Sequence, residues 1–215
     1  MASLGQLVAG IAHEINNPLG VVLMYAHLLL DELGDNEGIT GDLKMITEQA
    51  DRCKKIVAGL LHFARQNKVV LEPTSMHDFI DRALRATPVP DNVTVEVEHG
   101  LSDLIVQMDR DQMVQVLTNL VTNACGAMPE GGKIVVRTFG DTEQVSFSVS
   151  DTGTGIPEDI VAKIFEPFFT TKEIGMGTGL GLAVTYGIVK MHSGDIRVES
   201  NTDPAKGPTG TTFTV

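Results

Sequence analysis

Apolar residues in the first third of the chain recur at intervals of three and four. In the later of two such stretches they are Leu43, Ile46, Ala50, Cys53, Val57, Leu60 and Ala64. This heptad spacing predicts a long helix with one apolar seam, which packs against other helices as in a coiled coil. The earlier stretch has the same spacing, with a slip of one residue at Leu19, and comprises Leu4, Val8, Ile11, Ile15, Leu19, Val22, Ala26, Leu29 and Leu33.

A turn from Gly34 to Gly38 joins the two predicted helices. Pro18 lies beside the slip in the first helix, where a proline removes one hydrogen bond and bends the axis. Two helices with one seam each cannot bury both seams alone, whereas two copies of the hairpin can do so in a four-helix bundle. We therefore expect residues 1–67 to form a dimerisation domain.

Beyond residue 67 the pattern changes to short strands alternating with helices. Runs of strand length lie at 93–97, 104–108, 133–138, 145–149, 195–199 and 211–215. Helical patterns lie at 76–85, from Asp109 to about Met128, at 157–165 and at 180–192. Runs of strands with helices on one face predict an α+β sandwich over residues 72–215.

Charge and composition exclude several classes of protein. The formal net charge is −12, so neither a nucleic acid nor an anionic membrane surface would attract the chain. The sequence contains no signal peptide and no apolar run of about 18 residues, the length that crosses a membrane. Cys53 and Cys125 give no disulfide framework, which fits a reducing compartment such as the cytoplasm. Because the helical and strand patterns run to both ends, we expect a piece of a longer, cytoplasmic or membrane-attached protein.

His13 is the candidate nucleophile of the first helix. It lies two residues from both Ile11 and Ile15, which places it on the side opposite the apolar seam. Glu14 is its neighbour, and Asn17 shares its face one turn later. A carboxylate beside an exposed imidazole can fix one tautomer and take the ring proton during nucleophilic attack. The alternative for a single His-Glu pair is an ordinary solvated helix face.

Two further motifs offer polar groups for a nucleotide and its metal. Asn119 and Asn123 are four residues apart on a predicted helix, so their amides share one face, and Mg²⁺ prefers such oxygen ligands. Asp151 ends a strand and enters a turn with Gly153 and Gly155, where glycine permits close approach of the backbone. Read singly, the two asparagines could be surface residues and the turn could be only a turn.

Glycines also precede the helix predicted at 180–192. Gly177, Gly179 and Gly181 lead to Leu182, and free N–H groups at a helix N-terminus are a natural setting for phosphate. The segment before them, 165–175, carries aromatic residues and then Lys172, which suggests a lid with a cationic tip. For its phenylalanines alone, a place in the core is an equal alternative.

These motifs, in this order, resemble the catalytic core of the two-component sensor histidine kinases. Residues 12–19 are similar to the family's histidine box and 119–124 to its asparagine box. Residues 151–157 are similar to its first glycine box, 165–172 to its phenylalanine box and 177–182 to its second glycine box. The resemblance covers nearly the whole chain, and the wording HEINNPL with EPFFTTK is similar to the nitrogen-regulation-like subgroup. It implies a dimeric helical hairpin followed by a Bergerat-type ATP-binding α/β sandwich.

The resemblance also implies an activity. ATP would phosphorylate His13 with Glu14 as general base, and the phosphoryl group would pass to an aspartate of a response regulator. Asn17 would orient a water when the kinase acts as a phosphatase on that partner. The implied partners are a second copy, through residues 1–67, and a receiver domain, without nucleic acid or membrane contact by this part of the chain.

Roles in the nucleotide site follow from the same resemblance. Asn123 would bind Mg²⁺, with Asn119 close to the metal or a phosphate. Asp151 would accept a hydrogen bond from the adenine amine, with Gly153 and Gly155 lining the base pocket. The phosphates would be held by Lys172, Gly177, Gly179, Gly181 and Leu182.

The sequence disfavours three other functions. ATP-hydrolysing clamps and chaperones of the same nucleotide fold carry a Glu four residues before the metal asparagine, whereas this chain has Asn119, whose amide cannot take a proton from water. A dimeric scaffold that binds ATP without turnover is disfavoured by the intact motifs. A protein-serine kinase is disfavoured by His13 in its own motif.

Overall fold

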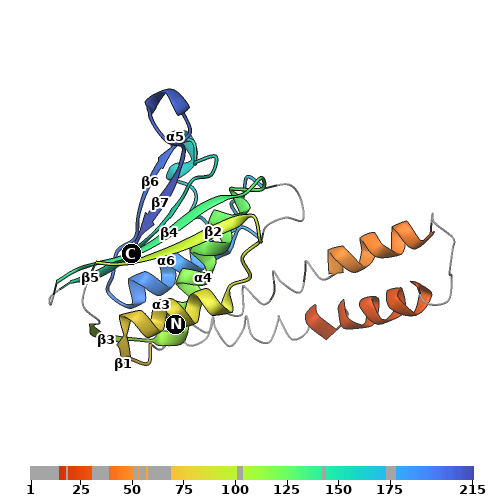
Figure 1. Ribbon diagram of the computed structural model, residues 1–215. Coiled ribbons are helices and arrows are strands. Elements are labelled where there is room, and N and C mark those ends of the chain that lie inside the picture. Colours follow the sequence, from red (N-terminus) through yellow and green to blue (C-terminus); the bar gives the residue numbers. More distant parts are fainter. Residues whose placement is uncertain are drawn as a thin grey trace. The chain divides into compact units, whose positions relative to one another are not determined.

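The computed structural model describes residues 15–17, 19–30, 39–50, 53, 57, 69–100, 104–141, 144–172 and 178–215 (Figure 1). The chain divides into two compact units. The first comprises Met1–Lys68 and Glu166–Val184. The second comprises Val69–Phe165 and Thr185–Val215.

Helices at residues 15–17 with 19–30, and at 39–50 with 53 and 57, form the predicted hairpin (red and orange in Figure 1). Leu43, Ala50 and Val57 are buried at intervals of seven, which confirms the heptad in the second helix. Ile46 is 45% exposed and Cys53 is also exposed. Among the described seam residues, one hairpin therefore covers every second position, because two helices can shield each other along only one line of contact.

A five-stranded mixed sheet forms the centre of the second unit. Its spatial order is β2-β4-β5-β7-β6, with β2 parallel to β4 and all other neighbours antiparallel. The strands are β2 Val93–His99, β4 Gly132–Gly140, β5 Val145–Asp151, β6 Arg197–Asn201 and β7 Gly210–Thr214. A separate antiparallel pair is formed by β1 Glu72–Ser75 and β3 Ile105–Met108.

Helices cover one face of this sheet (Figure 1). They are α3 Met76–Ala86, α4 Arg110–Gly126 and α6 Gly181–Met191. The short helix α5 Glu158–Val161 and the 3₁₀ turn η1 Pro204–Lys206 lie at the end of β6 and β7 instead (Figure 1). Phe79 of α3 meets the ring of Phe147 on β5 edge to face, with the ring centres 5.4 Å apart. The fully buried core continues through Leu117 and Leu120 of α4. The predicted α+β sandwich is confirmed.

Three elements differ from the sequence prediction. The helix expected at 157–165 is the four-residue α5. After α5 the chain enters a turn, in which the N–H of Lys163 donates to the carbonyl of Ile160 at 2.8 Å, and Pro167 disfavours helical backbone at the residue before it. The strand expected at 195–199 is β6, which starts two residues later, at Arg197. Asp195 lies instead in the turn after α6, where it pairs with Lys190 at 2.6 Å. Strand β1 was not predicted because it contains Pro73, which a short two-stranded pair tolerates.

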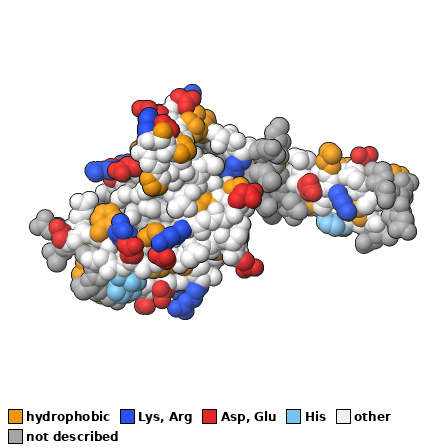
Figure 2. Space-filling model, turned by 45° about the horizontal axis from the view of Figure 1, so that its top comes forward, with side chains coloured by type: hydrophobic (Ala, Val, Ile, Leu, Met, Phe, Trp, Pro, Cys, Tyr) orange, Lys and Arg blue, Asp and Glu red, His pale blue; other side chains and the backbone are white. Residues whose placement is uncertain are grey.

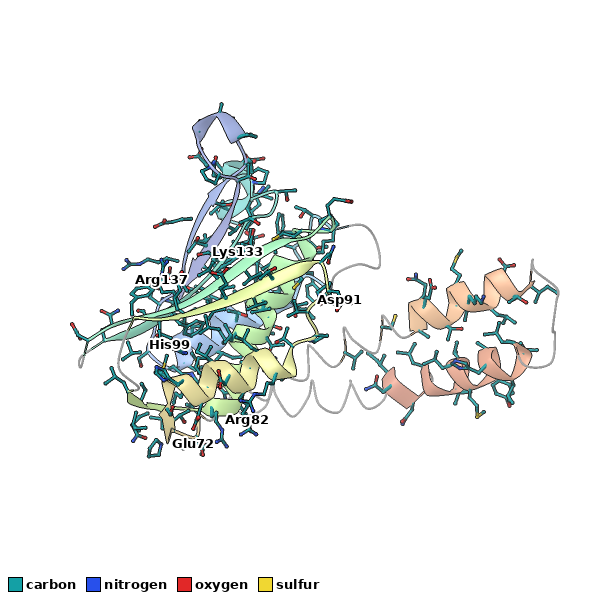
Figure 3. The ribbon with its side chains drawn as sticks, in the orientation of Figure 1. Glu72, Arg82, Asp91, His99, Lys133 and Arg137 are labelled. Atoms are coloured by element: carbon teal, nitrogen blue, oxygen red, sulfur yellow. The ribbon has the colours of Figure 1, made fainter. Side chains whose placement is uncertain are left out.

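Charges of both signs are interspersed on the surface that Figure 2 shows. Figure 3 labels Lys133 and Arg137 on β4. Lys133 pairs with Glu96 of β2 at 2.7 Å, and Arg137 pairs with Glu98 of β2 at 2.6 Å. Among the described residues, no helix is both long enough and apolar enough to span a membrane.

Candidate functional site

Helix α4 presents both asparagines of the predicted metal site. Its start is fixed by Asp109, whose Oδ1 accepts the N–H of Gln112 at 3.1 Å. Asn119 and Asn123 are half-buried and one turn apart, beside the face that packs on the sheet. The amide nitrogen of Asn119 lies 3.4 Å from the hydroxyl oxygen of Thr185, a fully buried residue of α6. This contact directs the nitrogen of the amide toward α6.

The carboxyl group of Asp151 is fixed at the end of β5. Its Oδ1 accepts the N–H of Gly153 at 2.9 Å and the N–H of Thr211, on β7, at 3.2 Å. Burial raises the pKa of Asp151 above its ordinary value, and the two N–H groups offset only part of that effect. Both hydrogen bonds fall on the same oxygen, so the group has one orientation and directs Oδ2 elsewhere.

The loop after Asp151 passes between the end of α4 and the end of β6. Thr154 N–H donates to the carbonyl of Ala127 at 3.3 Å, and a Cβ on Gly153 would come within 2.6 Å of that same oxygen. Gly155 has φ +75°, and a Cβ there would overlap the carbonyl of Asn201. Glycine is required at both positions, because any side chain would push the loop off its supports.

In the first unit, the segment before α6 is closed by a backbone hydrogen bond. Phe168 N–H donates to the carbonyl of Gly179 at 2.9 Å, and both residues have positive φ, +69° and +67°. Leu180 N–H lies 3.4 Å from the hydroxyl of Thr178, and α6 begins at Gly181. Lys172 is exposed, and Leu182 lies half-buried in the first turn of α6. Gly179 thus lies two residues before the first residue of α6, Gly181.

Three predicted site residues, His13, Glu14 and Gly177, lie outside the described residues. Asn17 is exposed on the first helix of the hairpin. Sequence reasoning missed Thr185 and Thr211, which contact predicted site residues. Hydroxyl residues in a helix and a strand carry no motif, and only the fold brings them to Asn119 and Asp151.

Two family models match the chain. Residues 3–68 match the His Kinase A (phospho-acceptor) domain. Residues 108–215 match the histidine kinase-, DNA gyrase B-, and HSP90-like ATPase. The first range includes the predicted nucleophile, and the second includes the asparagines, Asp151 and the glycines.

Curated relatives are longer than this chain. The sensor kinase CckA of Brucella abortus (strain 2308) is 39% identical over 100% of the chain and 24% of its own length. The signal transduction histidine-protein kinase AtoS of Escherichia coli (strain K12) is 36% identical over 93% of the chain and 33% of its own length. The chain therefore spans about a quarter to a third of these relatives.

Solved structures agree in fold over both domains. Full-length ShkA in complex with AMPPNP superposes with a TM-score of 0.77 at 26% identity, covering 97% of this chain and 44% of that one. Histidine kinase ThkA in complex with the response regulator protein TrrA gives a TM-score of 0.66 at 29% identity, covering 98% of this chain and 60% of that one. With the motifs, the matched domains and these relatives together, the chain belongs to the sensor histidine kinases, of which it forms the phospho-acceptor and ATPase core.

Proposed function

We propose that this chain transfers the γ-phosphoryl group of ATP to His13 and then to an aspartate of a response regulator. The observation that carries the proposal is the fixed carboxyl group of Asp151, in a loop that packs against the carboxyl end of the helix carrying Asn119 and Asn123. That arrangement suits an adenine nucleotide, and it occurs on a chain that also matches a phospho-acceptor domain. The nitrogen-regulation-like subgroup remains a prediction.

Adenine recognition would fall to Asp151. With Oδ1 held by two N–H groups, Oδ2 would accept the hydrogen bond of the exocyclic amine. Gly153 and Gly155 would line the base pocket with bare backbone. The phosphates would meet N–H groups at the start of α6, with Gly177, Gly179, Gly181 and Leu182, and the ammonium group of Lys172.

The donor set of α4 fits Mg²⁺. Amide oxygens are hard ligands, and Mg²⁺ takes a few protein oxygens while it keeps several waters. We infer that Asn123 binds the metal, and that Asn119 lies near the metal or a phosphate with its nitrogen held by Thr185. When bound, the ion would neutralise phosphate charge during transfer.

Phosphoryl transfer asks mainly for positioning from the protein. A ring nitrogen of His13 would attack the γ-phosphorus as the bond to ADP breaks, and Glu14 would take the ring proton. Asn17, exposed one turn later, would orient a water for the separate phosphatase reaction, in which water attacks the phosphoaspartate of the regulator and releases inorganic phosphate.

The hairpin supports the proposal of a homodimer. Ile46 and Cys53 belong to the predicted seam but are exposed in one chain, and a second hairpin would cover them. We propose residues 1–67 as the dimerisation and phospho-acceptor domain and 72–215 as the ATP-binding domain. A receiver domain would dock on the hairpin, and we propose that this part of the protein lies in the cytoplasm, where ATP is supplied.

Incubation with Mg²⁺ and γ-labelled ATP tests the proposal. We expect acid-labile, alkali-stable label on the protein, absent from His13→Ala although that variant still binds ATP. Label that persists in His13→Ala would overturn the assignment, and released phosphate without labelled protein would favour an ATPase. Asn123→Ala should lose Mg²⁺-dependent nucleotide binding, and Asn17→Ala should lose phosphatase activity while it keeps autophosphorylation.

A further inference from the structure

Ser200, on β6, lies at the centre of a hydrogen-bond cluster beside the Asp151 loop. Its hydroxyl accepts the N–H of Ile156 at 2.7 Å and donates to the carbonyl of Gly210 at 3.0 Å. The hydroxyl of Thr211, its partner across β6 and β7, lies 2.9 Å away. A serine hydroxyl has one proton and two lone pairs. With its proton on Gly210, Ser200 accepts from both Ile156 and Thr211, and its full capacity is used.

This cluster closes a ring around the Asp151 carboxyl. At one side, Gly153 in the loop donates to Oδ1, and the same loop reaches Ser200 through Ile156. At the other side, Thr211 donates its own N–H to Oδ1 and contacts Ser200 with its hydroxyl. Ser200 thus links the loop that carries Gly153, through Ile156, to Thr211 on β7.

We propose that Ser200 is a positioning residue for adenine recognition: it holds the loop and β7 at the separation that keeps Oδ1 of Asp151 occupied and Oδ2 directed at the base. The proposal rests on the proposed function, in which Asp151 reads the exocyclic amine. Alanine at this position leaves the N–H of Ile156 and the carbonyl of Gly210 without their shared partner, so the loop and the strand can separate.

The test compares two nucleotides by titration calorimetry on the full chain: ADP and purine riboside diphosphate, which lacks the 6-amino group. Ser200→Ala should weaken ADP binding about ten-fold and binding of the analogue less than about two-fold, because only the amine uses Asp151. Ser200→Cys has a similar volume and weaker hydrogen bonds, so its loss of ADP affinity should lie between those of the wild type and Ser200→Ala. If Ser200→Ala does not fold, Ser200→Cys serves as the test variant. Equal weakening of both nucleotides would overturn the proposal.

Thr212→Val is the matched control. Thr212 also makes a cross-strand hydroxyl contact, to Ser150 at 2.9 Å, but it is the neighbour of Thr211 and so lies on the opposite face of β7. We expect it to leave the ratio of the two affinities unchanged, and an equal loss of discrimination in this variant would contradict a specific role for Ser200.

Asp151→Asn separates this inference from the function on which it rests. If Asp151→Asn binds ADP as tightly as the wild type, the role of Asp151 fails whatever Ser200 does. If Asp151→Asn no longer binds ADP more tightly than the analogue, adding Ser200→Ala should change the ADP affinity by no more than about two-fold, since the two residues act through one contact. Independent, additive effects would overturn the role of Ser200 alone.

Discussion

Asp109 donates its backbone N–H to Nε2 of His192 across 3.0 Å, although the two residues are 83 positions apart. Because Nε2 accepts, the ring proton lies on Nδ1, which donates to the carbonyl of Ile188 at 2.9 Å. The imidazole therefore joins the start of α4 to the end of α6 with both nitrogens engaged.

His192→Ala should lower the free energy of unfolding by about 2 kcal/mol, because the half-buried N–H of Asp109 loses its acceptor. Urea denaturation followed by circular dichroism measures the change. His27→Ala is the control, since that ring bonds only within its own helix, to the Leu23 carbonyl, and should change stability by less than about 0.5 kcal/mol. Equal losses in the two variants would contradict a bridging role for His192.

Asp151→Asn should weaken ADP binding about a hundred-fold, since a neutral amide is a poorer acceptor for the adenine amine than a carboxylate. The same variant should be more stable than the wild type at pH 7. Burial raises the pKa of Asp151 in the folded state, because the fold favours the protonated carboxyl over the charged one. The stability that this preference gives the wild type is fully present below the unfolded-state pKa and is lost as pH rises through the folded-state pKa. Thermal melts of both proteins between pH 7 and acid pH should show the difference in Tm shrinking on acidification, and a constant or growing difference would refute the linkage.

The limit of prediction from sequence is clear at this carboxyl group. Periodicity predicted α3, α4 and α6, and glycines placed Asp151 in a turn, because each of these signals is local. Thr211 and Ser200 were not singled out, since their positions depend on β5 pairing with β7 and β7 with β6. Pairing between distant strands is set by the packing of the whole sheet and leaves no short motif.

Thr185→Val should weaken nucleotide binding about three-fold to ten-fold in the presence of Mg²⁺ and little in its absence. Valine fills the same buried volume but removes the hydroxyl group that faces the Asn119 amide. Titration of ADP with Mg²⁺ and with a chelator measures the two affinities. Thr185→Ser retains the hydroxyl and should behave as the wild type, and an equal loss without metal would count against a role for Asn119 near Mg²⁺.

Ile46→Glu should convert a dimer to a folded monomer. Leu43 and Ala50 stay buried within one hairpin, whereas Ile46 is 45% exposed in a single chain and would be covered only by the second copy. Sedimentation equilibrium measures the mass. Met45→Glu, one residue away and 62% exposed, lies off the seam and should remain dimeric, and monomers from both variants would show a general charge effect instead.

Gly179→Ala should abolish tight nucleotide binding. A Cβ at this position would overlap the backbone of Phe168, and φ is +67°. Gly207→Ala is the control, because its φ of +136° is also strained for alanine but no atom lies within 4 Å of the new Cβ. Calorimetry with ADP should show near-normal affinity for Gly207→Ala, and similar affinity for both variants would mean that the Phe168–Gly179 hydrogen bond does not shape the phosphate site.

The hydrogen bond from Thr211 to Asp151 spans 60 positions of the chain. During synthesis, the strand that bears the aspartate leaves the ribosome well before the strand that fixes it. Until β7 arrives, the carboxylate of Asp151 lacks one of the two N–H groups that orient it, and under the proposed function the growing polypeptide should bind nucleotide poorly. ATP can then favour completion of this domain only after β7 has emerged, so the ligand stabilises the completed domain and does not act as a template for its earlier strands.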